Sequence, residues 1–408
     1  MRVIVLISLL AALVAPLGAG AGILSATRHD DALTSSSFAP RSVTFISTQT
    51  GLALGTVACA SAGACLQLRA TTDAGRTWSL RSLPAGLVAA ADRKAAGIEA
   101  DLSDGAGLDV RFADAQNGWI YGNLAVTTPP SGGAYAALEP TLWSTHDGGR
   151  VWTKRSLPGF SNGATFDLEA EAGLVHLLWQ NGGGRVRVES SPVTEDRWRD
   201  SSTGATLGNP AGGGYQLGSI VLEGSTGWLI EGNDRGTYGS ARLGRDGRWH
   251  AWMTPPCSTV GGGFAVPAAA TPNELVAICI MGGFANPLSP AAPRGATLGS
   301  SWLYVSHDGG ARFEAAHELG RQGTISFGSV LASPQPGVIL TTRDEGSREQ
   351  LIASFDGGAE WRGVYTGAVT YLGFTTPSQG VALVAQSRTR TAMIMTFDGG
   401  QHWSQVRF

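Results

Sequence analysis

Five aspartates recur inside one motif, with Ser or Thr two residues before the acid and Gly two residues after it. Carboxylates can act as acid and base in hydrolysis or bind metals. Here the neighbouring residues supply what a tight turn needs, namely local hydrogen bonds and a backbone conformation that a side chain would forbid. The motif therefore favours a folding role. The copies are Thr71-x-Asp73-x-Gly75-x-x-Trp78, Thr145-x-Asp147-x-Gly149-x-x-Trp152, Ser306-x-Asp308-x-Gly310-x-x-Phe313, Ser354-x-Asp356-x-Gly358-x-x-Trp361 and Thr396-x-Asp398-x-Gly400-x-x-Trp403.

Arginine offers a second chemistry, because its guanidinium group binds carboxylates through two parallel hydrogen bonds. Six arginines fall between β-rich runs of the sequence. One interpretation is a ligand surface that recognises carboxylates or acidic peptide segments. The other is ordinary surface solubility, since Asp234, Asp344, Glu345 and Glu349 are interspersed among them. The six are Arg185, Arg235, Arg343, Arg348, Arg388 and Arg390.

Four cysteines fall into two pairs, Cys59 with Cys65 and Cys257 with Cys279. In an oxidising compartment an even count indicates disulfides, and we predict these two bonds. A metal site is a weaker alternative, because there is no C-x-x-C motif and no histidine nearby. The histidines are scattered, so the sequence predicts no metal site, no nucleophilic triad and no cofactor.

The strands that must position these residues follow a repeating pattern upstream of each aspartate motif. An apolar strand, a short polar turn and a glycine-led β-rich run recur seven times, most clearly at Val110–Phe112 with Gly118–Gly122. Two weaker motifs complete the count, Thr194-Glu195-Asp196-Arg197-Trp198 and Arg245-Asp246-Gly247-Arg248-Trp249. A single four-stranded unit cannot cover both of its apolar faces, so the seven units must stack radially and close. The prediction is an all-β, seven-bladed β-propeller over residues 41–408, with the aspartate turn between strands 3 and 4 of each blade.

The long insertions all belong to one face of this propeller, which carries the loops between strands 2 and 3 and the connectors between blades. The insertions are 86–107, 124–140 and 282–300. Both cysteine pairs and the six arginines map to the same face, which makes it the expected binding surface. The ring is expected to close between whole blades, unless a strand near Ser36–Pro40 joins the last blade.

The repeated motif is similar to the Asp-box, or BNR repeat, and residues 41–408 resemble the WD40/YVTN/BNR-like propellers. The spacing of the motif residues between Phe112 and Trp152 resembles in particular that of the seven-bladed photosystem II assembly and stability factors. This resemblance implies an exported, non-enzymatic factor that holds a membrane-protein client through an arginine-bearing face. The insertions and cysteine pairs depart from the family's pattern and argue against a photosystem client.

Asp-boxes also occur in sialidases and glucan hydrolases, so the alternative is an exo-acting glycoside hydrolase. A sialidase needs three arginines on the sugar carboxylate, a tyrosine activated by a glutamate, and an aspartate acid/base. The Phe-Arg-Ile-Pro start of that family is absent, since Phe38-Ala39-Pro40-Arg41 does not match it, and the sequence places no tyrosine beside a glutamate. We therefore predict a non-catalytic module that binds a protein or glycan.

The N-terminal segment is typical of export. Arg2, the apolar run Val3–Ala15 and the small residues Ala19–Ala21 predict a signal peptide, residues 1–21, followed by an extension, residues 22–40. An uncleaved membrane anchor is the alternative, because the apolar stretch reaches Ile23. The net charge of -3 gives no reason to expect a nucleic-acid partner. We expect a monomer outside the cytoplasm.

Overall fold

In the computed structural model the chain divides into two units, Met1–Ser35 and Ser36–Phe408. The second unit holds all of the residues that the structure describes. None of the described segments forms a helix that is long and apolar enough to cross a membrane. The described residues are 38–59, 63–87, 107–125, 138–156, 166–180, 186–203, 207, 217–233, 236–257, 266–280, 293–297, 300–321, 330–344, 348–387 and 390–408.

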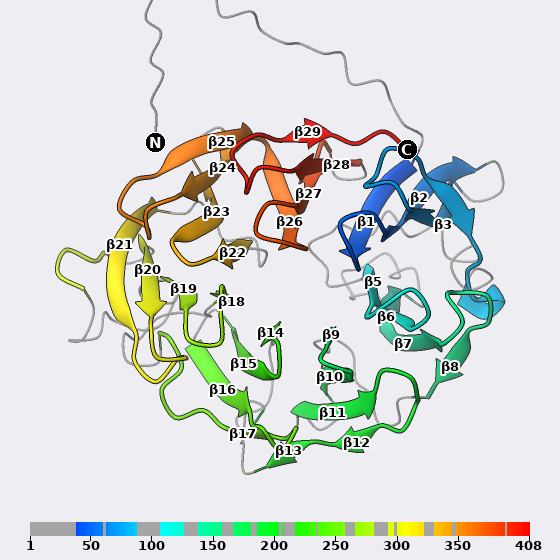
Figure 1. Ribbon diagram of the computed structural model, residues 1–408, viewed down its shortest axis with the longest axis horizontal. Helices are drawn as coiled ribbons and strands as arrows, with labels where there is room; N and C mark the ends of the chain where they lie inside the picture. The colour runs from blue at the N-terminus through cyan, green and yellow to red at the C-terminus, as the bar shows by residue number, and fades with distance from the viewer. Residues whose placement is uncertain are drawn as a thin grey trace, which may run out of the picture. The chain divides into compact units, whose positions relative to one another are not determined.

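Seven antiparallel sheets surround a central axis, each with its first strand innermost (Figure 1), which confirms the predicted seven-bladed propeller. Blade 1 contains β1 (Phe38–Phe45), β2 (Gly51–Cys59), β3 (Gly63–Thr71) and β4 (Ser79–Arg81). Blade 2 contains β5 (Gly107–Phe112), β6 (Gly118–Ala125), β7 (Leu138–Thr145) and β8 (Thr153–Arg155). Blade 3 contains β9 (Phe166–Glu171), β10 (Leu174–Gln180), β11 (Val186–Pro192) and β12 (Arg199–Asp200).

The second half of the ring continues this order. Blade 4 contains β14 (Leu217–Glu223), β15 (Thr226–Asn233), β16 (Gly236–Leu243) and β17 (Trp249–Ala251), and β13 (Ser202–Thr203) extends it in parallel with β17. Blade 5 contains β18 (Val266–Ala269), β19 (Leu275–Ile280), β20 (Ser300–Ser306) and β21 (Glu314–Arg321). Blade 6 contains β22 (Leu331–Gln335), β23 (Val338–Asp344), β24 (Glu349–Ser354) and β25 (Arg362–Thr366). Blade 7 contains β26 (Ala368–Phe374), β27 (Gly380–Ala385), β28 (Thr391–Thr396) and β29 (Ser404–Gln405).

The aromatic residue and the glycine of the upstream pattern are cross-strand partners. Phe112 at the end of β5 pairs with Gly118 at the start of β6, and a Cβ atom at Gly118 would lie 2.5 Å from the Phe112 ring. Only glycine leaves room for a ring that lies across the neighbouring strand. The phenylalanine and glycine of blades 1 and 7 repeat this arrangement.

The apolar core of the described residues is divided into seven clusters, one in each seam between neighbouring blades. The aromatic residue of every motif, including the two weaker copies, packs into the seam with the preceding blade. The motif therefore fixes each blade to the one before it as well as turning the chain. Trp78, Trp152, Trp361 and Trp403 are half-buried, whereas Trp249 is completely buried.

The motif aspartate organises its turn through hydrogen bonds. The side-chain hydroxyl of Thr71 donates to Asp73, the N–H of Gly75 donates to the Thr71 hydroxyl at 2.9 Å, and the N–H of Thr77 donates to Asp73 at 2.9 Å. Hydrogen bonds from Thr77 and Thr71 lower the pKa of Asp73 to about 2. The hydroxyl and glycine bonds recur in the other four copies. In the five copies, therefore, the aspartate side chain is hydrogen-bonded within its own turn.

The weaker copies use different contacts. Asp196 of blade 3 accepts a hydrogen bond from Ser144 of blade 2 at 2.6 Å, and so it links two blades. Between blades 3 and 4, the indole N–H of Trp249 donates to Nδ1 of His176 at 3.1 Å, and this nitrogen lies 2.6 Å from the hydroxyl of Ser190. Burial lowers the pKa of His176 to about 4, so the imidazole is neutral at pH 7.

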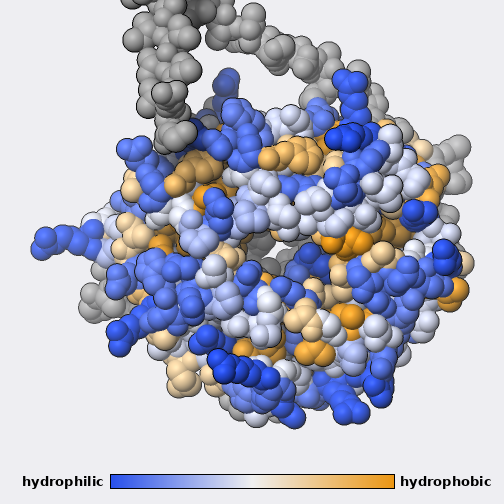
Figure 2. All heavy atoms as spheres, in the orientation of Figure 1, coloured by the Kyte–Doolittle hydropathy of each residue, from blue (hydrophilic) through white to orange (hydrophobic). Residues whose placement is uncertain are grey.

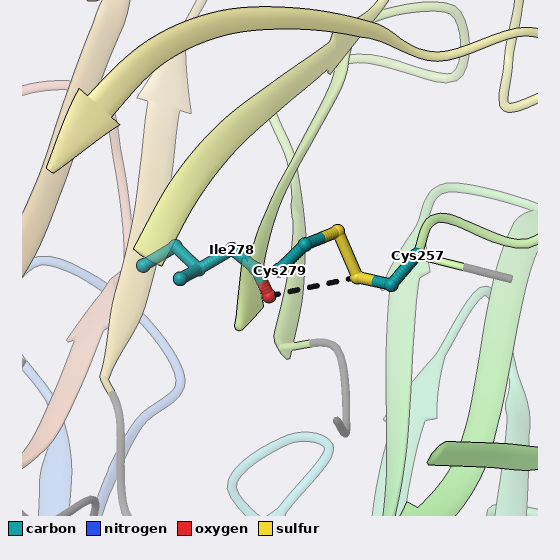
Figure 3. The surroundings of a disulfide bond; sticks show 3 residues. All are labelled: Cys257, Ile278 and Cys279. Carbon is teal, nitrogen blue, oxygen red and sulfur yellow. Dashed lines mark hydrogen bonds between the residues drawn. A yellow bond between two sulfur atoms is a disulfide. The ribbon is translucent and has the colours of Figure 1, made fainter. Parts of the chain in front are cut away.

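The predicted bond between Cys257 and Cys279 is present (Figure 3). It joins the segment after β17 in blade 4 to β19 in blade 5, and both residues are buried in the seam between these blades. Cys65 is also disulfide-bonded. The side chain of Cys59, its predicted partner, lies outside the described residues.

Replacing Cys257 and Cys279 together by serine is expected to lower the free energy of unfolding by about 3 kcal/mol, the typical effect of opening a loop of this length. Urea denaturation of the double variant and of the wild type measures the difference. Mass spectrometry of unreduced peptides tests both bonds directly. Free thiols, or peptides that join Cys59 to Cys257, would contradict the assigned pairing.

The ring closes between two complete blades. β1 begins at Phe38, inside the segment assigned from the sequence to the N-terminal extension, and belongs to the sheet of blade 1. The contact with blade 7 is made by side chains. Phe38 packs against Phe408, with ring centroids 4.6 Å apart, and Gln379 donates a hydrogen bond to the carbonyl of Thr48 at 3.0 Å.

Candidate functional site

The antiparallel order of the strands gives the ring two different faces. We call the end that carries the loops between strands 2 and 3 and the connectors the loop face, and the end that carries the aspartate turns the turn face. Among the predicted arginines, Arg348 precedes β24 and Arg390 precedes β28, whereas Arg343 was wrongly placed in a loop and lies inside β23, paired with Gln350 of β24. These three lie on the loop face of the adjacent blades 6 and 7. Arg185, Arg235 and Arg388 lie outside the described residues.

The exposure of these arginines differs. Arg348 and Arg390 are exposed, and Arg343 is half-buried. The backbone of Arg390 is hydrogen-bonded on both sides, because its N–H donates to the hydroxyl of Ser387 at 3.1 Å and its carbonyl accepts the N–H of Gln386 at 2.8 Å.

A further arginine, Arg41, approaches this region and was missed from the sequence. It follows Pro40 in β1, and the carbonyl of Pro40 accepts a hydrogen bond from Thr391, the residue after Arg390. Arg41 and Arg390 are therefore the chain neighbours of two residues that are hydrogen-bonded across the seam between blades 1 and 7. Burial lowers the pKa of Arg41. Because Arg41 lies within a strand, its sequence position did not indicate that it could belong to a binding site formed by loops.

A second group of charged residues borders the opening at the axis of the ring, which is visible in Figure 2. These residues alternate along the innermost strands of blades 2, 3 and 4, where the sequence analysis assigned no function. They are Asp109 and Arg111 of β5, Asp167, Glu169 and Glu171 of β9, and Glu223 of β14.

The three carboxylates of β9 contact both neighbouring blades. Asp167 and Glu171 accept backbone N–H groups of blade 4 at 2.6 and 2.7 Å. Glu169 forms an ion pair with Arg111 of blade 2, and each of these side chains keeps 23% of its surface exposed. The cluster is thus built into the inner seams while remaining open to water at the axis.

The electrostatics of this cluster are dominated by burial and by neighbouring acids. Burial raises the pKa of Asp167 to about 6, and it also raises the pKa of Glu169, against the attraction of Arg111. Burial alone would lower the pKa of Arg111, but Glu169 and other neighbours raise it, so the guanidinium stays charged. Carboxyl groups that titrate near neutral pH beside a fixed cation are typical of sites that transfer protons or bind ligands.

Two tyrosines complete the cluster. Arg111 donates a hydrogen bond to the hydroxyl of Tyr371 of β26, and Tyr121 of β6 lies within electrostatic range of Glu169. Burial raises the pKa of both tyrosines. A tyrosine–glutamate pair could not be recognised from the sequence, because Tyr371 and Glu169 belong to blades that only the closed ring brings together. Among the described residues, no group of three or more His, Cys, Asp or Glu side chains is arranged to hold a metal ion.

No protein-family model matches this chain, and no curated protein matches it. Solved structures show the same fold. YCF48 bound to a D1 peptide is 16% identical, with a TM-score of 0.51, over 88% of this chain and 92% of that one. The BP39L lectin from Burkholderia pseudomallei is 12% identical, with a TM-score of 0.53, over 91% and 98%. A PL25 ulvan lyase with a bound saccharide is 10% identical, with a TM-score of 0.51, over 90% and 92%.

Proposed function

We propose that this protein is an exported binding propeller, without catalysis of its own, that takes a protein or glycan partner on its loop face. The observation that carries this proposal is the placement of Arg343, Arg348 and Arg390 on that face of two adjacent blades. Two of these guanidinium groups are exposed, and arginine recognises carboxylates with two hydrogen bonds at once.

The turn face supports this assignment indirectly. Its recurring aspartates are occupied by turn hydrogen bonds, as expected if the motifs are Asp-boxes. Propellers of this shape include YCF48, solved with a D1 peptide, and the BP39L lectin. A carboxylate-bearing peptide or an acidic glycan is therefore the partner class that we propose.

Export is the second part of the proposal. The N-terminal pattern of Arg2, the apolar run and Ala19–Ala21 supports a signal peptide, and the buried disulfide between Cys257 and Cys279 is consistent with an oxidising compartment. Determining the N-terminal residue of the protein recovered from its native host would test both cleavage after Ala21 and export.

Replacing Arg343, Arg348 and Arg390 together by glutamine is expected to weaken binding to acidic peptides or uronate- and sialate-bearing glycans by at least about tenfold. The estimate assumes that each charge-assisted hydrogen bond contributes about 1.5–3 kcal/mol. Binding is measured on peptide and glycan arrays at two salt concentrations. The matched control replaces Arg76, Arg150 and Arg312, three exposed arginines of the turn face. Equal losses in both triple variants would rule out a loop-face site.

A second candidate, a glycoside hydrolase, is favoured by one observation, the cluster of Glu169, Asp167, Arg111 and Tyr371 at the axis. A carboxyl group of raised pKa can donate a proton to a leaving sugar, and a second carboxylate can act as base or nucleophile. Incubation of the mature protein with sialosides and β-glucans tests this reading. Turnover that is abolished by Glu169→Gln would replace the binding proposal.

A further inference from the structure

Strand β9 differs from the other innermost strands because it places three carboxyl groups in alternate positions, Asp167, Glu169 and Glu171. Alternate residues of a strand point to the same side and lie about 7 Å apart. Like charges at this spacing repel one another, and partial burial strengthens the repulsion because it lowers the local dielectric. Complete ionisation of all three groups is therefore unfavourable in the folded ring.

Each of these groups also joins blade 3 to a neighbour. Asp167 accepts the N–H of Ile220, and Glu171 accepts the N–H of Gly224, so the two ends of β9 are attached to β14 of blade 4. Glu169 is paired with Arg111 of blade 2. The groups that repel one another are thus the groups that connect three consecutive blades.

The surrounding elements add more acids than bases. β5 contributes Asp109 and Arg111, β14 contributes Glu223, and β6 and β26 contribute Tyr121 and Tyr371. On β10, His176 is the cross-strand partner of Glu169, and burial keeps its imidazole neutral. Arg111 acts electrostatically on three of these carboxyl groups, Asp109, Asp167 and Glu169.

We propose that β9 is a pH-sensitive latch, which holds blade 3 against blade 4 more tightly when its carboxyl groups take up a proton. A protonated carboxyl group still accepts an N–H through its carbonyl oxygen, so the contacts to Ile220 and Gly224 survive while the repulsion along β9 is relieved. Above neutral pH the three charges coexist, and the inner seam of blades 3 and 4 loosens.

The direction in which stability changes with pH follows from the coupling between proton binding and folding. Burial raises the pKa of Asp167, Glu169 and Glu171 above the ordinary range, so the folded state binds protons more readily than the unfolded state. The associated stability is present at acidic pH and is lost as pH rises through the raised values. His176 acts in the opposite direction, but only below its ordinary pKa near 6.5, because its folded-state pKa is lowered to about 4. A comparison above pH 6.5 therefore isolates the carboxyl groups.

The test compares thermal unfolding at pH 6.5 and pH 8.5 for the wild type and for Asp167→Asn/Glu169→Gln/Glu171→Gln, because the pKa of Glu169, raised to about 8, lies within this interval. Amides keep a carbonyl oxygen for the N–H groups of Ile220 and Gly224 but cannot ionise. The melting temperature of the wild type is expected to fall by a few degrees over this interval, and that of the variant to stay level. Glu314→Gln/Glu318→Gln, on the exposed outer strand β21, is the matched control and should behave like the wild type.

Hydrogen exchange of the wild type supplies a measurement that needs no variant. After correction for intrinsic rates, amides of residues 166–171 and 217–223 should exchange faster at pH 8.5 than at pH 6.5, while β22 and β23 stay unchanged. A wild-type melting temperature that is level over this interval, a variant that keeps the wild-type slope, or uniform exchange would overturn the latch. None of these outcomes depends on the loop-face arginines.

Discussion

Trp249→Ala is expected to destabilise the propeller by about 3–5 kcal/mol, the usual range for deleting a buried tryptophan. The Trp249 ring has no exposed surface and fills the seam between blades 3 and 4. Its indole N–H donates to Nδ1 of the neutral His176. Alanine would leave a cavity and would also remove the hydrogen-bond donor of a buried imidazole.

Urea denaturation followed by circular dichroism measures this change. Trp361→Ala is the matched control, because Trp361 holds the same motif position in blade 6 but is half-buried, and its indole N–H bonds to Gly358 of its own turn. The loss at Trp361 should be clearly smaller. Equal losses of unfolding free energy for Trp249→Ala and Trp361→Ala would show that the stabilising effect of the motif tryptophan does not depend on how deeply its ring is buried in the seam.

Phe38→Ala is expected to cost a similar amount, about 3–5 kcal/mol, because Phe38 closes the ring. Its side chain is 2% exposed in the cluster between blades 1 and 7, against Phe408. Phe408 is also 4.8 Å from Trp78, measured between ring centroids. No strand is shared between blades 1 and 7 among the described residues. The ring is therefore held closed by these aromatic contacts and by the hydrogen bonds across the seam.

A double-mutant cycle on the free energy of unfolding tests this reasoning. Phe38→Ala and Phe408→Ala remove the two sides of one contact, so their combined effect should be smaller than the sum of the separate effects. Phe397→Ala, a change at a phenylalanine that is 58% exposed, is the control and should alter stability little. Strict additivity at Phe38 and Phe408 would contradict their role as one closing contact.

The fold could be predicted because its rules are local and repeated. Phe112 and Gly118 must be cross-strand partners for the ring to lie over the next strand, and Asp73 needs Thr71 and Gly75 beside it to form its turn. Such constraints leave the same Phe–Gly spacing in blades 1, 2 and 7 and the same aspartate motif in five blades. The weaker copies show the limit of this reasoning. Trp198 and Trp249 keep their place in the seams, whereas Asp196 contacts another blade instead of its own turn.

The central cluster could not be predicted for the opposite reason. Arg111, Glu169 and Tyr371 come from blades 2, 3 and 7, and they converge only when the ring has closed. The alternation of charged residues in β9 was a usable signal, since an innermost strand with polar residues at alternate positions must present them to the axis or to a neighbouring seam. Arg348 and Arg390 lie in loop positions as predicted, whereas Arg343 lies within β23, and the sequence could not predict how exposed each of the three side chains is.

The central claim is that a partner binds to the loop face and not to the axis, and one array experiment separates the two. Wild type, Arg343→Gln/Arg348→Gln/Arg390→Gln and Asp167→Asn/Glu169→Gln are applied to the same acidic-peptide and acidic-glycan array. The account predicts that the arginine variant loses the bound probes while the axial variant retains them. Retention by the arginine variant together with loss by the axial variant would place the ligand in the central opening and contradict the account.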